Sequence, residues 1–357
     1  MNMWQTKFIT GKNPSGKPII SVLAKKTYAI KNGEVACDAQ VPIPLYDSDL
    51  YDDPENCSFA EVIAQSDLIP FKKSTDVVIL GKVTSPGTKL ARYLDCDVTA
   101  GPYKKCVRAY GKRILKRKGI RGIALSEPEP FKEVTLGYKN AYGGVSRSKD
   151  GTVYVYYPNP IGKGFNLKGG VDDVAEIEVP NLEDPNLPLR PKDLLMSKFT
   201  GWTKVPAPVS LGWTRKNFYP RYTLCGVIPE QLQGAMSDTD NAGSLNTKAD
   251  FDFFQGASVG LWGKRLSGDE IIKLTYMDSQ FPLFETALPA EIPVMLLDTG
   301  DGANELEPFL DTVTIIKDQN LLTVLWRGSS QFQTLEEING ARKIECRVSG
   351  TKGNRPI

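Results

Sequence analysis

Short runs of β-branched and apolar residues, each closed by Gly, Pro or Asn, recur along almost all of the 357 residues. Such runs form strands and the closing residues favour turns, so the pattern predicts short strands connected by turns. The clearest runs are PIISVLAKKTYAI (18–30), STDVVILGKV (74–83), TVYVYYPNP (152–160), DEIIKLTYMD (269–278), DTVTIIKDQN (311–320), LLTVLWRG (321–328) and ARKIECRVS (341–349). The helices that alternate with strands in parallel sheets are missing. We therefore expect a mainly β fold, an antiparallel β-sandwich or barrel-like core with a few short helices and long Gly/Pro-rich connectors.

Helical signals are few. In the segment 58–68, Ser58 and Glu61 have the spacing of a capping box, which predicts a helix start at Ser58. Short helices are also predicted within 190–199 and 229–236, and within 247–257 from Thr247. Each is expected to be only a few turns long, so none of them changes the fold class.

A hairpin is predicted between YLDCDVTAG and YKKCVRAYG, with its turn at Gly101 and Pro102. The register that places Asp95 opposite Arg108 also places Leu94 opposite Ala109. This register keeps charges on one face and apolar groups on the other, which favours it.

No linker divides the chain, since strand signals recur up to residue 348. We expect one large β-rich domain over 1–349, with a possible subdivision into 1–125, 126–290 and 291–349 and a frayed tail over 350–357. The apolar runs are too short for a membrane-spanning helix, and the amino terminus lacks a signal pattern. These features favour a cytoplasmic location.

Histidine is absent, which excludes nucleophile systems that depend on histidine and metal sites with histidine ligands. The six cysteines form no CxxC pair, so reduced thiols are expected. The net charge of +2 indicates no general attraction to nucleic acid or anionic lipid. No cofactor, metal or small-molecule substrate is therefore predicted.

The stretch YPNPIGKGFN, Tyr157 to Asn166, has two glycines around a lysine and could cradle a phosphate. A Walker loop needs an earlier glycine, a Ser or Thr after the lysine, and a helix that follows. None of these is present. The sequence favours a glycine-rich turn.

Two kinds of charge cluster could be binding sites or merely solvated surface. Nine Lys and Arg between Lys104 and Arg121 could contact phosphates, although half of this run alternates as a strand. The acidic stretches 47–55 and 237–243 lack the spacing of a calcium loop. Turns and solvated faces are the favoured interpretation of both.

Two further groups of residues each allow a functional and a structural interpretation. Asp250 and Asp252 could act as an acid–base pair, but helix capping or salt bridging is favoured. Trp202, Trp213 and Phe218, set among prolines, could form an aromatic binding surface, although packing against a core is favoured. If the chain docks a partner through these connectors, these aromatics are the predicted contacts.

Several segments together resemble a bacterial family of unknown-function domains encoded in type VI secretion gene clusters, beside PAAR-like spike-tip proteins and toxins. The resemblance runs from VLAKKTYAIKNGEV through SDLIPFKKSTDVVILGKVTSPG, EPFKEVTLGYKNAYGG, YPNPIGKGFN and TKADFDFFQGA to DTVTIIKDQNLLTVLWRG, or about residues 18 to 330. The residues that match the motifs are Asp67, Leu68, Pro70, Lys72, Thr75, Asp76, Asn159, Pro160, Gly162, Gly164, Phe165, Asp250, Phe251 and Asp252.

The resemblance implies a non-enzymatic adaptor or chaperone, which binds a PAAR-like spike-tip protein or toxin and helps load it on the type VI secretion spike. Two alternatives stay open. One is a hydrolase that uses carboxylates such as Asp250 and Asp252, and the other is a structural component of the secreted tip.

Overall fold

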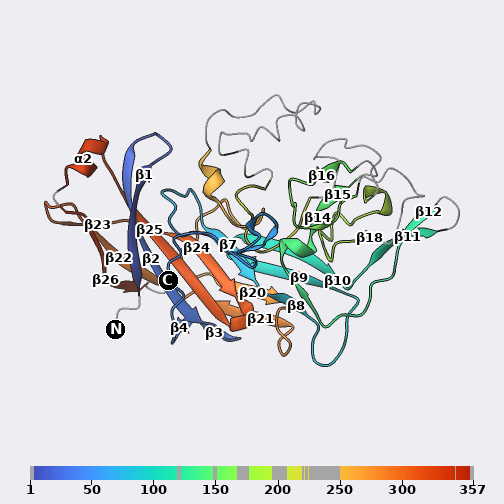
Figure 1. Cartoon of the computed structure of the whole chain (residues 1–357). Helices are drawn as coiled ribbons and strands as arrows, with labels where there is room; N and C mark the ends of the chain where they lie inside the picture. Colours follow the sequence, from blue (N-terminus) through green and yellow to red (C-terminus); the bar gives the residue numbers. More distant parts are fainter. Residues whose placement is uncertain are drawn as a thin grey trace.

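The computed structural model describes residues 4–118, 122–147, 151–166, 177–194, 207–218, 221, 224, 250–341 and 343–353. Strands dominate this part of the chain and the helices are short, which confirms the mainly β prediction (Figure 1). The sheets formed by the described residues all stay open, so the barrel-like alternative is wrong for them.

The central sheet has the strand order β1-β2-β25-β24-β7, with β4 also paired to β2. All pairs are antiparallel except β24 with β7. Strand β2 is buried over almost its whole length, as expected for a strand covered on both faces. The bounds are β1 (Gln5–Lys12), β2 (Pro18–Ala29), β4 (Cys37–Asp38), β7 (Asp76–Leu80), β24 (Pro308–Ile316) and β25 (Leu321–Gln331).

A second sheet has the order β19-β10-β9-β20-β21-β3. Its central hairpin pairs Asp95 with Arg108 and Leu94 with Ala109, which confirms the register predicted from the charge pattern. The bounds are β3 (Glu34–Val35), β9 (Tyr93–Ala100), β10 (Tyr103–Tyr110), β19 (Leu182–Glu183), β20 (Ile271–Thr275) and β21 (Leu283–Ala287).

A third sheet, with the order β23-β22-β26, packs face to face on the central sheet. At Gly328 of β25, an added Cβ would touch Leu306 and Met295 of this sheet, so the two layers are in close contact. Its strands are β22 (Glu291–Asp298), β23 (Ala303–Leu306) and β26 (Glu345–Gly353). Residues 350–353 therefore belong to a strand, and the frayed tail predicted from residue 350 is wrong for them.

The remaining strands form small sheets at the other end of the molecule and beside the second sheet (Figure 1). They are β5 (Leu50–Tyr51), β6 (Val62–Ala64), β8 (Lys82–Thr84), β11 (Ile114–Lys118), β12 (Gly122–Leu125), β13 (Glu133–Thr135), β14 (Tyr142–Gly143), β15 (Val145–Arg147), β16 (Val153–Val155), β17 (Lys163–Gly164) and β18 (Ile177–Glu178). The described helices are η1 (Cys57–Phe59), η2 (Tyr138–Asn140), η4 (Pro191–Asp193), η8 (Phe251–Phe254), η9 (Lys317–Gln319) and α2 (Leu335–Asn339).

The helix predicted over 58–68 is wrong. The segment forms one turn of 3-10 helix at Cys57–Phe59 and then strand β6. The segment 190–199 forms only η4 within its described residues, and 229–236 lies outside the described residues. The fourth predicted helix is present as η8, which begins after Asp250; Thr247 lies outside the described residues.

Candidate functional site

Two motif segments that are far apart in the sequence, 67–76 and 250–256, lie against each other. Phe71 and Phe251 meet edge to face, with ring centroids 5.3 Å apart. The side-chain amide of Gln255 donates to Asp76 Oδ1 at 2.8 Å, and the backbone N–H of Gly256 donates to Oδ2 at 2.7 Å. The family-like residues of these two segments thus belong to one connected unit.

At the centre of this unit is a group of four charged side chains, Lys72, Asp76, Asp311 and Arg327, which we call the ionic cluster. Lys72 Nζ is 2.8 Å from Asp76 Oδ2 and 3.2 Å from Asp311 Oδ1, and Arg327 Nε is 2.7 Å from Asp311 Oδ2. None of the four side chains is more than 3% exposed. Two cations and two anions therefore balance each other inside the core.

Local backbone structure places Asp311 in this cluster. The pairing of β24 with β25 shifts between Leu310 and Thr312, so Asp311 is the extra residue of a β-bulge. A bulge re-aims a side chain relative to the regular alternation of the strand. Thr312 lies directly opposite Asp76 on the parallel neighbour β7, and its hydroxyl accepts a hydrogen bond from Lys72 at 2.9 Å.

Two members of the cluster, Lys72 and Asp311, are held in the ionised state by their charged neighbours. Burial alone would lower the pKa of Lys72, but attraction by Asp311 and Asp76 outweighs it and raises this pKa. Burial would likewise raise the pKa of Asp311, but Lys72 and Arg327 outweigh it and lower the pKa. The cluster is thus a set of charges stabilised by each other, without a neutral carboxylic acid at Asp311.

These shifts predict how stability depends on pH. Because the folded pKa of Asp311 lies below the unfolded value of about 3.9, its contribution is present above about pH 4 and is lost as the pH falls through the folded pKa. Asp311→Asn should therefore show a constant deficit in the free energy of unfolding between about pH 5 and 9, which shrinks in more acidic buffer. Urea denaturation across this range checks it. A deficit that already varies between about pH 6 and 8 would contradict the assignment.

A second buried pair, Lys25 and Asp67, sits where the motif begins, with Nζ 2.8 Å from Oδ2. Burial lowers the pKa of Lys25 and raises that of Asp67, and their mutual attraction offsets this only in part. Asp67 also accepts the backbone N–H of Tyr46 at 2.8 Å. This pair therefore links the start of the motif to β2.

The other residues of the first motif have packing and backbone roles. The carbonyl of Pro70 accepts the Ser21 hydroxyl at 2.7 Å, and the Thr75 hydroxyl donates to the Leu310 carbonyl at 2.6 Å. Leu68 is half-buried, and its N–H donates to the hydroxyl of Ser66 at 3.2 Å. These contacts fix the path of the motif across the face of the central sheet.

The Gly-rich loop 157–166 is a structural turn, as the sequence favours. The amides of Gly162 and Lys163 donate to the carbonyls of Asn159 and Ala141, so these two groups are not free for a phosphate. Lys163 Nζ is 2.8 Å from a carboxylate oxygen of Glu178. The buried side-chain amide of Asn159 donates to the carbonyls of Tyr138 and Tyr142, at 2.8 and 3.1 Å. Half-buried Pro160 follows it in the turn.

Gly164 of this loop cannot be replaced without strain. Its φ is +94°, and an added Cβ would lie 2.8 Å from the Pro180 ring. We expect Gly164→Ala to lower the free energy of unfolding by about 1–3 kcal/mol, because both the backbone and the contact oppose it. Gly151→Ala is a control with positive φ and open space, and should cost less. Equal losses for both, measured by thermal unfolding, would show that the contact with Pro180 has no effect.

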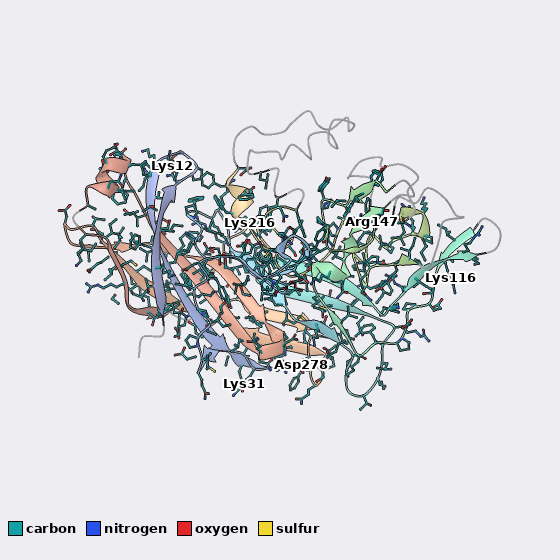
Figure 2. The ribbon with its side chains drawn as sticks, viewed as in Figure 1. Lys12, Lys31, Lys116, Arg147, Lys216 and Asp278 are labelled. Atoms are coloured by element: carbon teal, nitrogen blue, oxygen red, sulfur yellow. The ribbon has the colours of Figure 1, made fainter. Side chains whose placement is uncertain are left out.

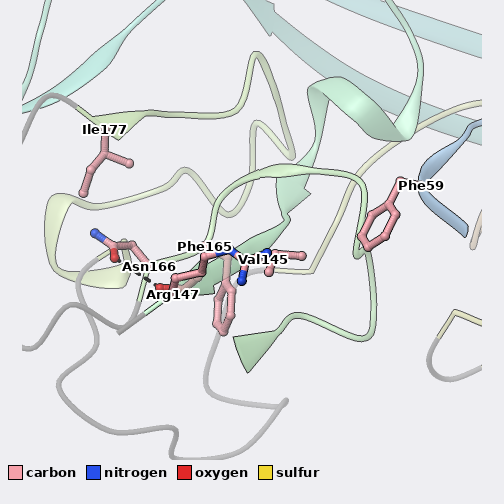
Figure 3. Close-up of a pocket in the computed structure, with 7 residues that line it drawn as sticks. Phe59, Val145, Arg147, Phe165, Asn166 and Ile177 are labelled. Atoms are coloured by element: carbon pink, nitrogen blue, oxygen red, sulfur yellow. Dashed lines mark hydrogen bonds between the residues drawn. The ribbon is translucent and has the colours of Figure 1, made fainter. Parts of the chain in front are cut away.

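The end of the loop borders an open pocket of about 560 Å³ (Figure 3). Its lining residues are Phe59, Val145, Ser146, Arg147, Phe165, Asn166 and Ile177. Phe165 packs on Tyr156, with ring centroids 5.4 Å apart. Arg147 is the single charged residue among the lining residues, so this set lacks an acid–base pair.

Asp250 and Asp252 both face Lys73, with Nζ 2.9 Å from an oxygen of each carboxylate. Asp250 also caps η8 by accepting the backbone N–H of Asp252, and this bond together with Lys73 lowers the pKa of Asp250. The favoured interpretation, capping and salt bridging, is confirmed. Both carboxylates are 32% exposed, whereas an acid–base pair would need one carboxylate kept neutral by burial.

Two of the three aromatics predicted for a partner surface lie in the interior. Trp213 is 7% exposed and pairs through its backbone with Ala257. Phe218 is fully buried and meets the Tyr138 ring edge to face, with centroids 5.8 Å apart. Packing against the core, the interpretation that the sequence favours, is confirmed for these two residues, and the alternative that they are partner contacts on the surface is wrong. Trp202 lies outside the described residues.

The other charge clusters are partly neutralised within the chain. In the basic run, Arg108 forms a two-pronged pair with Asp95 at 2.5 and 2.7 Å, and buried Arg113 pairs with Glu183. The acidic stretch 47–55 gives ion pairs to Lys7, Lys139 and Lys216. In the described ranges, no group of His, Cys, Asp or Glu has the arrangement of a metal site, and no helix is long and apolar enough to cross a membrane.

Sequence reasoning missed three members of the site: Asp311, Arg327 and Gln255. All three are buried, and two are charges within strands made largely of buried apolar residues and threonine. A charge inside a buried strand requires a partner, and that signal was available in FLDTVTII and LLTVLWRG. Their partners lie on other segments of the chain, so spacing along the chain does not reveal them.

Comparison with known proteins identifies the family to which the chain belongs. A model described as "Uncharacterized protein conserved in bacteria (DUF2169)" matches residues 15–327. No curated protein and no solved structure matches the chain. The matched range includes the whole ionic cluster, the Gly-rich loop and the segment 250–256. The chain therefore belongs to this uncharacterized bacterial family, DUF2169.

Proposed function

We propose that the protein is a cytoplasmic, non-enzymatic adaptor of a bacterial type VI secretion system, which binds a PAAR-like spike-tip protein or toxin and helps load it on the spike. The observation that carries the proposal is the order of motif segments between about residues 18 and 330, which resembles that of accessory proteins encoded beside spike-tip proteins.

The geometry of the motif residues supports a binding role over a chemical one. Lys72 and Asp76 balance charges in the core, Lys163 is held by Glu178, and Asp250 and Asp252 are held by Lys73. Side chains used in this way form a rigid frame. A rigid frame that carries segments at its surface is suited to protein–protein contact.

The test is a tagged pull-down from the native host, with mass spectrometry of the cells and of the culture fluid. An adaptor should recover a PAAR-like protein or spike subunit from the cells and stay out of the secreted fraction. Its appearance outside the cells with the spike would favour a structural tip component. If no secretion protein is recovered from either fraction, the proposed function is wrong.

A further inference from the structure

The two edges of the central sheet differ in whether their outward backbone groups are hydrogen-bonded. At the β7 edge, the backbone N–H groups of Thr75, Val77 and Ile79 donate to carbonyls of neighbouring segments at 2.9 to 3.0 Å. Those carbonyls belong to Lys264, Leu261 and Leu211, so chain from elsewhere covers this edge. The opposite edge is β1, and among the described strands it pairs only with β2 (Figure 1).

The direction of the outer groups of β1 follows from the ladder. Phe332 N donates to Pro18 O and Ile30 N to Asn320 O, so even-numbered residues of β2 direct their backbone groups toward β25. In an antiparallel ladder the backbone N–H and C=O groups of successive residues point to opposite sides of the strand. The odd-numbered residues of β2 therefore bond to β1. Their register partners in β1 are also odd-numbered. The even-numbered residues of β1 thus direct N–H and C=O away from the sheet; they are Thr6, Phe8, Thr10 and Lys12.

Among the described residues, this outer edge is open. No backbone hydrogen bond joins these four residues to any other part of the chain that the structure describes. Two of the usual means of blocking an edge are missing as well, since β1 has no proline and pairs with β2 over eight residues without a bulge. Lys7, which could repel a strand, is paired with Asp47. Phe8 is 40% exposed beside the open groups.

We propose that β1 is a docking edge, to which an extended segment of a partner protein adds as a further strand. Unpaired strand groups are satisfied by another strand, so the backbone chemistry specifies an extended polypeptide. Lys12 lies at the tip of the β1–β2 hairpin (Figure 2), and Lys17 directly precedes β2. Neither forms an ion pair with a described carboxylate. The segment should therefore carry Asp or Glu at the end beside the tip, and β-branched or aromatic residues beside Phe8.

This inference deepens the proposed function by naming the surface and the kind of segment bound, but its test does not depend on that function. The probe is an eight-residue capped peptide of alternating Val and Thr that ends in two Asp residues. A matched peptide that ends in two Lys residues is the charge control. Residue-resolved amide exchange by NMR is followed on the full chain at millimolar peptide.

The acidic peptide should slow exchange of the Thr6, Phe8 and Thr10 amides by at least about tenfold, because each gains a hydrogen bond, and the lysine peptide should bind several-fold more weakly. Thr10→Pro should abolish the effect, since it removes an outward N–H and leaves the ladder to β2 in place. Thr10→Ala is the matched control and should bind as the wild type does. Thermal unfolding of both variants checks that the sheet is intact.

Unchanged exchange with either peptide, or equal binding to Thr10→Pro and Thr10→Ala, would overturn the docking edge. Protection that rises with protein concentration in the absence of peptide would also overturn it, because a second copy would then occupy β1. If the peptide docks but no spike protein is recovered from the host, the edge stands and the proposed function fails.

Discussion

Replacing Lys72 by methionine should lower the free energy of unfolding by about 3–5 kcal/mol, because it leaves buried Asp76 and Asp311 without their shared cation. The same replacement at the next residue, Lys73, is a matched control. Lys73 is 42% exposed and its partners are 32% exposed, so Lys73→Met should cost no more than about 1 kcal/mol. Urea denaturation of both variants measures the difference.

This pair of variants tests whether the ionic cluster holds the motif in place. If Lys72→Met and Lys73→Met lower the free energy of unfolding by equal amounts, the ionic cluster does not hold the motif in place. Asp311→Asn adds a second check, because Lys72 and Asp311 are in contact. The double variant should be less destabilised than the sum of the single variants by about 0.5–3 kcal/mol. Strict additivity would contradict the direct pairing.

Phe218→Ala should lower the free energy of unfolding by about 3–5 kcal/mol, because it empties a fully buried site beside Tyr138 and Ala141. Phe281→Ala is the control, since Phe281 is 41% exposed and its truncation should cost no more than about 1 kcal/mol. Thermal and urea unfolding report both. A stable Phe218→Ala variant that has lost only partner binding would restore the surface role and refute the packing role.

The sequence predicted features that are set by residues close to each other along the chain. The register of the 93–110 hairpin followed from charges that must share one face, and both strands lie close together in the sequence. Capping by Asp250 also depends on a neighbour two residues away. The helix over 58–68 failed because Glu61 accepts the N–H of Tyr138 rather than closing a capping box. Residues Val62 and Ala64 then alternate as strand β6, which pairs with β5.

The site was predicted only in part for a related reason. Lys72 and Asp76 were singled out, but their partners Asp311 and Arg327 are on β24 and β25, and the bulge that aims Asp311 has no signal in the sequence. The interface role given to Trp213 and Phe218 failed because a Pro-rich setting suggests surface, whereas both residues pack that connector against the core, as the favoured interpretation has it. Long-range pairing decided each of these positions.

The most direct test of the central claim is to delete the gene in its host and measure the PAAR-like protein or toxin in cells and in the culture fluid. If the protein is an adaptor, the cargo should still be made but should no longer be secreted, and the full chain should restore secretion. Secretion of the cargo at the wild-type level without this protein would contradict the account.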